Sequence, residues 1–149
     1  MFYALFALAA LVIAGLAFYA GRLLFLLKRQ NQRQYEAKQK RIDNITESIK
    51  TIALAMSQQQ CDLSEGAIRI YRLLEALPLD PRPDYDTQFP QLRELFLKVV
   101  GFDTHEARQA LDKRERRRQD KAREEIEAEY ESRILPELEK ITTFCNSLG

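Results

Sequence analysis

Residues 1–21 read MFYALFALAALVIAGLAFYAG, and none of these side chains carries a charge. At 1.5 Å per residue, a helix of this length extends about 31 Å, which matches the hydrocarbon core of a bilayer. Basic residues follow directly, beginning with Arg22, whose long side chain can reach the headgroups from the end of the span. The sequence therefore predicts a transmembrane anchor over residues 1–27.

A cleaved signal peptide is the main alternative for this segment. A signal peptide carries basic residues before its apolar run and small residues at positions −3 and −1 of the cleavage site. No Lys or Arg precedes the run here, and a cut after Ala20 would place the bulky Phe18 at position −3. We therefore expect an uncleaved, single-pass anchor.

The charges that follow the apolar run predict its orientation. Seven basic residues lie within residues 22–41, where Glu36 is the single acid. Because basic residues flank the cytoplasmic end of membrane helices, we expect the N-terminus outside and the C-terminal domain in the cytoplasm. Residues 28–41 are predicted to form a basic juxtamembrane helical stalk close to anionic headgroups. Small side chains in the span would permit helix contacts, which leaves a homo-oligomer as an alternative to a monomer.

Composition argues against several function classes. The chain has 23 basic and 22 acidic residues, so nucleic acid is not an expected partner by composition. Its one histidine and two cysteines, Cys61 and Cys145, are too few and too widely separated for a zinc site. With five glycines, it has no glycine-rich loop for a phosphate-bearing cofactor. We therefore predict no metal, no cofactor and no catalytic residue, in a protein that is not an enzyme.

Apolar residues recur at helical spacing in the cytoplasmic part of the chain. The first stripe comprises Ile42, Ile45, Ile49, Ile52 and Met56. Asp62 and Glu65 match a capping box, which predicts a helix that begins there and ends at Pro78. Pro90 suits the first turn of another short helix. A loop rich in proline and aspartate is expected between these two helices.

The longest helix is predicted in the C-terminal third of the chain. Asp103 and Glu106 match a second capping box, so we expect this helix to run from about Thr104 towards residue 145. Pro136 should kink or split it, because proline lacks a backbone N–H and crowds the preceding turn. Its apolar stripe resumes after a charged stretch, with Ala122, Ile126, Tyr130, Ile134, Leu138 and Ile141.

Residues 42–149 are thus predicted to be a cytoplasmic all-α domain, a small bundle of two long helices and two short ones. Since the short helices cannot cover the long apolar stripes, we expect the two long helices to pair antiparallel. Ile45 would then lie opposite Ile134. The acidic residues between 124 and 139 would lie beside the basic side chains of Lys38, Lys40, Arg41 and Lys50.

The densest run of positive charge is KRERRR, at residues 113–118. One hypothesis is that its cations bind phosphates, lipid headgroups or an acidic protein, through Lys113, Arg114, Arg116, Arg117 and Arg118. The alternative is a solvated helix face stabilised by ion pairs such as Lys121–Glu125. No aromatic residue lies among these cations, which argues against stacking on single-stranded bases.

Three other features have ordinary structural explanations. His105 lacks the second histidine, four residues on, that a zinc-peptidase motif requires. Cys61 precedes a predicted helix but has no basic neighbour in sequence, so we interpret it as a structural cysteine. The aspartates between residues 80 and 86 alternate with prolines in a turn-rich loop and do not match a calcium-binding pattern.

Two longer segments carry a family resemblance: MSQQQCDLSEGAIRIYRLLEAL at residues 56–77 and THEARQALDKRERRRQDKAREEIEAEYESRIL at residues 104–135. Behind an N-terminal anchor, they resemble a bacterial family catalogued as domain of unknown function 2489. The resemblance implies a small protein with one membrane helix in the bacterial inner membrane. Since no activity is assigned to that family, the resemblance implies no catalytic residues.

Within these segments, residues 61–66 and 104–111 both lie at predicted helix starts, which antiparallel pairing would bring to the same membrane-distal end of the bundle. This predicts a partner-binding tip comprising Ser64, Glu65, His105, Glu106 and Arg108. We therefore predict a membrane-anchored helical interaction or scaffold protein with an unknown protein partner. The alternative is a binder of an anionic lipid surface or nucleic acid through the Arg-rich segment, residues 113–118.

Overall fold

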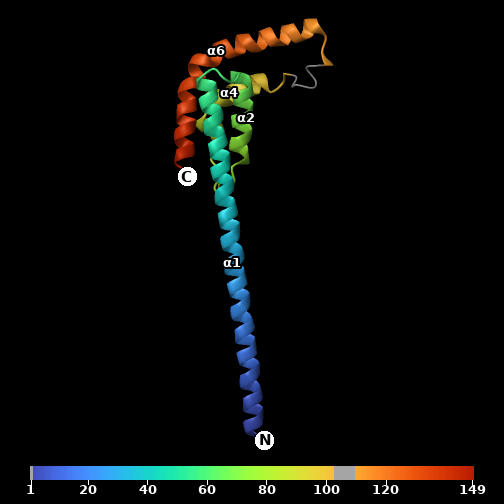
Figure 1. The fold of residues 1–149 in the computed structure, drawn as a ribbon, viewed down its shortest axis with the longest axis vertical. Coiled ribbons are helices and arrows are strands. Elements are labelled where there is room, and N and C mark those ends of the chain that lie inside the picture. Colours follow the sequence, from blue (N-terminus) through green and yellow to red (C-terminus); the bar gives the residue numbers. More distant parts are fainter. Residues whose placement is uncertain (1, 103–109) are drawn as a thin grey trace. The chain divides into compact units, whose positions relative to one another are not determined.

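The computed structural model describes residues 2–102 and 110–149. Their regular structure is entirely helical (Figure 1), which confirms the predicted all-α class. The chain divides into two compact units, residues 1–40 and 41–149. The helices are α1 (Phe2–Ser57), α2 (Leu63–Ala76), α3 (Tyr85–Gln88), α4 (Pro90–Val99) and α6 (Lys113–Asn146).

The first unit consists of the N-terminal part of α1. Its apolar side chains are exposed all round the helix, among them Leu11 at 72% and Phe18 at 76%. The most apolar stretch of 18 residues in α1 has a mean hydropathy of 2.2, and none of its residues is buried. By length and composition, α1 is therefore a candidate membrane-spanning helix.

The second unit has one hydrophobic core, to which each of the five described helices contributes. The predicted stripe on α1 is confirmed, because Ile42, Ile49 and Met56 are buried in this core. Helix α4 packs against both α2 and α6, and α3 packs beside α4. Burial of each large apolar side chain contributes about 1.5–3 kcal/mol. Those that are fully enclosed include Ile49, Ile70, Leu74, Leu92, Leu95, Ile134 and Ile141.

The end of α1 and the C-terminal half of α6 lie antiparallel. Gln59, just beyond α1, donates to Glu131 Oε1 at 3.2 Å, whereas Lys50 lies near Cys145, close to the end of α6. This register differs from the predicted one. A shallow pocket is lined by Met56 of α1 and by Glu131 and Leu135 of α6, so the part of α6 around Leu135 lies beside the last turn of α1, not beside Ile45.

Four acids of the stretch predicted to lie beside Arg41 and Lys50 have other partners within the second unit. Glu131 binds Gln59, Glu129 forms an ion pair with Lys98 at 3.3 Å, and Glu127 and Glu137 bind the first turns of α2 and α4. Lys50 pairs instead with Glu47 on its own helix, at 2.9 Å. The observed register explains this difference, because it brings these acids to helix ends.

The last helix begins later than predicted, at Lys113 instead of about Thr104. Asp112 is its N-cap residue, and the Asp112 carboxylate accepts a hydrogen bond from Lys113 N at 2.8 Å. The predicted capping box at residues 103 and 106 lies outside the described residues. Pro136 is inside α6, which continues to Asn146, so proline does not split this helix. Figure 1 shows α6 bending between its orange and red parts.

Candidate functional site

An open groove runs along the surface between α1 and α6. It has a volume of about 670 Å³, within the range of small-molecule sites. Ala53 and Leu138, each 3% exposed, are its best-buried apolar residues, whereas Leu54 is 57% exposed. We call this feature the α1–α6 groove; its lining residues are Lys50, Ala53, Leu54, Ser57, Leu135, Leu138, Glu139, Thr142 and Thr143.

The hydroxyl groups that line the α1–α6 groove are already hydrogen-bonded. Ser57, Thr142 and Thr143 each donate to a carbonyl oxygen three or four residues earlier on their own helix, at 2.8–2.9 Å. A ligand that covers these hydroxyls therefore leaves no donor without an acceptor. The groove is consequently suited to an apolar side chain.

The two walls of the groove carry opposite charges. Lys50 stands on α1, and its hydrogen bond to Glu47 is the main cause that raises the pKa of the Lys50 ammonium. Glu139 is exposed on α6, and among the described residues no cation forms an ion pair with its carboxylate. One wall thus offers a cation and the other offers an anion.

Two carboxylates of α6 cap the shorter helices. Glu127 accepts hydrogen bonds from Ser64 N, at 3.1 Å, and from the Ser64 hydroxyl at the start of α2. Glu137 accepts from Gln91 N at 3.2 Å and Leu92 N at 2.6 Å at the start of α4. Burial raises the pKa of Glu137, and these two N–H groups partly oppose the rise. The carboxylates satisfy backbone donors that a helix start leaves unpaired.

The predicted capping box marks the start of α2 correctly, but its hydrogen bond to the Asp62 side chain is not formed. Asp62 is the N-cap residue, but its side chain makes no capping hydrogen bond, since Glu127 binds the first turn instead. This contact turns Ser64 inward, where it is 3% exposed. Ser64 therefore cannot present its hydroxyl to a partner at the predicted tip. Glu65 forms an ion pair with Arg69 at 3.0 Å. His105, Glu106 and Arg108 lie outside the described residues.

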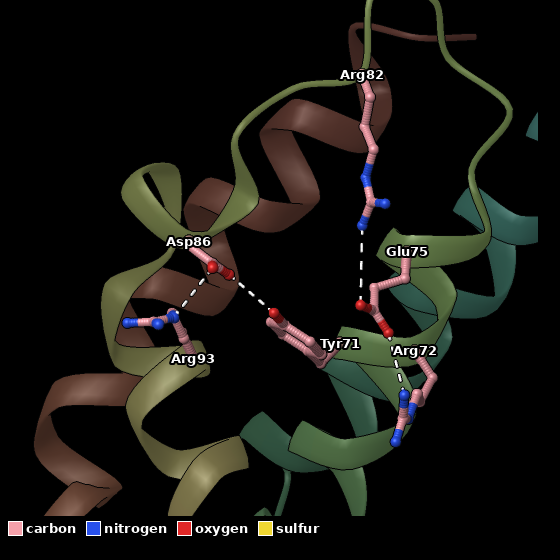
Figure 2. Close-up of polar contacts among 6 residues, drawn as sticks. All are labelled: Tyr71, Arg72, Glu75, Arg82, Asp86 and Arg93. Atoms are coloured by element: carbon pink, nitrogen blue, oxygen red, sulfur yellow. Dashed lines mark hydrogen bonds and ion pairs between the residues drawn. The ribbon is translucent and has the colours of Figure 1, made fainter.

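A polar network ties α2, α3 and α4 together on the surface (Figure 2). The Tyr71 hydroxyl donates to Asp86 Oδ1 at 2.8 Å, and Arg93 Nε pairs with Asp86 Oδ2 at 3.0 Å. Glu75 pairs with Arg72 and with Arg82, at 3.2 and 3.8 Å. The hydrogen bond to Asp86 is the main cause that raises the pKa of Tyr71. Because its charges pair internally, this network positions helices and is a poor candidate for a ligand site.

The Arg-rich segment forms the first turns of α6. Arg116 is half-buried, and its Nη2 donates to Leu111 O at 3.4 Å. The other basic side chains are exposed: Lys113, Arg114, Arg117, Arg118 and Lys121. Four of these, at positions 114, 117, 118 and 121, have the spacing of a single helix face. The ion pairs nearby are long, 3.7 Å for Arg118–Glu115 and 3.9 Å for Lys121–Glu125.

Comparison with known proteins identifies the family. The profile described as "Protein of unknown function (DUF2489)" matches residues 13–141. The chain belongs to the DUF2489 family. It is also 39% identical, over 138 residues, to a Haemophilus influenzae protein named "Uncharacterized protein", covering 93% of this chain and 91% of that protein. No solved structure matches the chain. The family resemblance inferred from the sequence is thus confirmed.

The region matched by the DUF2489 profile includes both capping glutamates, which sequence reasoning missed. Their positions relative to the apolar stripe of α6 could have identified them. Glu127 and Glu137 lie three residues before Tyr130 and three after Ile134, so both fall on the buried face of the helix. An acid on such a face needs a partner, because burying an unpaired carboxylate is costly. The identity of each partner depended on which helix start came to lie beside it.

Proposed function

We propose that this DUF2489 protein is a single-pass inner-membrane protein whose residues 42–149 form a cytoplasmic helical interaction module with a binding rather than a catalytic role. One observation carries the proposal. The single helix α1 contains the apolar candidate span, and its last turns supply Ile49 and Met56 to the core of the second unit. The seven cations of residues 22–41 support the cytoplasmic orientation.

The α1–α6 groove supports an interaction role. It combines an exposed leucine, buried apolar residues and hydroxyls that are already hydrogen-bonded. Grooves of this kind accept apolar side chains of a partner, particularly those of a helix. We take this groove, rather than the predicted tip, as the docking surface of the module.

Membrane fractionation with reporter fusions tests the location. Green fluorescent protein or alkaline phosphatase is fused after Gly149, and a matched version lacks residues 1–27. The full chain should resist alkaline carbonate extraction, fluoresce and give no phosphatase activity, whereas the shortened version should be recovered in the soluble fraction. Phosphatase activity from the full chain would contradict the proposed orientation.

Affinity capture from native membranes tests the interaction role. Leu54→Lys places a charge in the groove, and Leu97→Lys changes a residue of similar exposure, 55%, that does not line it. Proteins that bind through the groove should be retained by the wild type and Leu97→Lys and lost from Leu54→Lys. Identical recoveries from all three chains would contradict docking in the groove.

A second candidate function rests on the exposed cationic face of α6. The long ion pairs of Arg118 and Lys121 on this face support binding to an anionic lipid surface. The full chain, reconstituted in phosphatidylcholine vesicles, should capture added phosphatidylglycerol vesicles in a salt-dependent manner. Arg117→Gln with Arg118→Gln should abolish capture, whereas Arg69→Gln with Arg72→Gln on α2 should not. Equal capture by both double variants would contradict a specific role for this face.

A further inference from the structure

We propose that the α1–α6 groove is occupied by Leu54 of a second copy of this chain, which forms a two-fold symmetric dimer. The inference deepens the proposed function and rests on it, because a shared membrane orients both copies in the same direction. The following features of the second unit favour a second copy over an unrelated partner.

The groove and the side chain that would fill it belong to one patch. Leu54 is 57% exposed at the edge of the groove, next to the buried Ala53 and Leu138. A two-fold interface requires a patch that complements itself, because each copy presents the same surface. A partner of another kind would need only the groove, whereas two copies make use of the exposed leucine as well. Leu97 is exposed to a similar extent but does not line this groove.

The charges of the patch also complement themselves. Lys50 stands on one wall and Glu139 on the other. Two-fold symmetry brings each wall to face the opposite wall of the partner, so that two Lys50–Glu139 pairs can form. Lys50 donates to Glu47 in the single chain, and an ammonium has three donors, so it can bind a second carboxylate.

Membrane attachment reduces the contact area that such a dimer needs. Stable protein–protein interfaces bury about 800 Å² on each partner, more than one leucine and its groove provide. Confinement to a common surface raises the effective concentration of the two copies, so a smaller contact can hold them together. We therefore expect the dimer in membranes and much less of it among the same chains in dilute detergent.

Disulfide cross-linking in native membranes tests the contact. The full chain carries Cys61→Ser, which removes the more accessible native cysteine, since Cys145 is buried. Leu54→Cys is compared with Leu97→Cys as the matched control for exposure. Because contacts across the axis place the two copies of position 54 close together, Leu54→Cys should cross-link about tenfold more than Leu97→Cys. Equal cross-linking of the two variants would overturn the inference.

Charge exchange provides a second test that does not depend on introduced cysteines. Energy transfer between full chains labelled with two fluorescent proteins is measured in membranes. Lys50→Glu and Glu139→Lys should each reduce the transfer, and the double variant should restore it. Failure of the double variant to restore transfer, while helix content is unchanged, would overturn the Lys50–Glu139 pairing.

The two proposals fail in different ways. If reporter fusions show the predicted topology but Leu54→Cys does not cross-link, the dimer is wrong and the anchored module remains. If the chain cross-links through position 54 but extracts as a soluble protein, the anchor is wrong, and with it the argument from membrane confinement.

Discussion

The two parts of α1 differ in how their apolar side chains are arranged. In residues 2–27 they surround the helix and are exposed, whereas in residues 42–56 all but Leu54 lie on one stripe that packs against other helices. Ile13 and Ile49 illustrate the contrast, at 67% and 0% exposed. An apolar surface on all sides calls for an apolar medium, whereas a single stripe calls for a protein partner.

The sharpest test replaces the same residue type in each part. Ile49→Ala should lower the free energy of unfolding of the second unit by about 2–5 kcal/mol, because it leaves a cavity in a closed core. Ile13→Ala should leave that free energy unchanged. Urea unfolding of the full chain in mild detergent, followed by the near-ultraviolet circular dichroism of tyrosine, measures both. An equal loss of unfolding free energy in Ile13→Ala and Ile49→Ala would contradict the contrast between the two parts of α1.

Removing a carboxylate from either unit should lower the free energy of unfolding by less than Ile49→Ala does. Glu137→Ala leaves the N–H groups of Gln91 and Leu92 without their acceptor, which costs about 1–3 kcal/mol. Glu36→Ala removes an exposed acceptor of one hydrogen bond from Gln32 and should cost less than about 0.5 kcal/mol. The same unfolding assay compares them. A loss with Glu36→Ala as large as with Glu137→Ala would contradict the capping role.

Glycine replacement compares the space around each part of α1. A Cβ at Gly66 of α2 would lie 2.3 Å from Met56 Sδ, whereas a Cβ at Gly21 meets nothing within 4 Å. Because Met56 is enclosed, Gly66→Ala should destabilise the second unit by about 1–2 kcal/mol, and Gly21→Ala should not. Adding Met56→Ala to Gly66→Ala should then cost less than the sum of the single changes. Additive losses would contradict the steric explanation.

Ionisation of the Cys145 thiol has the smallest effect on stability at neutral pH, and its effect grows in alkaline solution. Burial raises the pKa of this thiol from 9.0 to about 11. The unfolded chain loses the proton near pH 9 while the folded chain retains it, so stability should fall between about pH 9 and 11. Cys145→Ala should reduce this slope, whereas Cys61→Ser should affect it less. Identical pH profiles for wild type and Cys145→Ala would indicate that the thiol is not buried.

Local signals in the sequence predicted several elements correctly. The prolines correctly predicted the end of α2 before Pro78 and the start of α4 at Pro90. Proline has a fixed φ and no backbone N–H, so its effect on a helix does not depend on distant residues. The short helix α3 was missed; Asp84 caps it through Thr87 N at 3.3 Å, within what was predicted to be a loop. The capping box at Asp62 and Glu65 marked the correct helix start but named the wrong acceptor. A distant residue, Glu127, provides that acceptor, and no local pattern identifies it.

By itself, the sequence determined the helical class, the candidate span and the buried stripe of α1, because these depend on spacing along one chain. Only the tertiary structure decided the α1–α6 register, the caps supplied by Glu127 and Glu137, and the groove at Leu54. Register depends on how side chains of different helices interlock, and a shift of a few residues changes every partner while leaving each helix pattern intact.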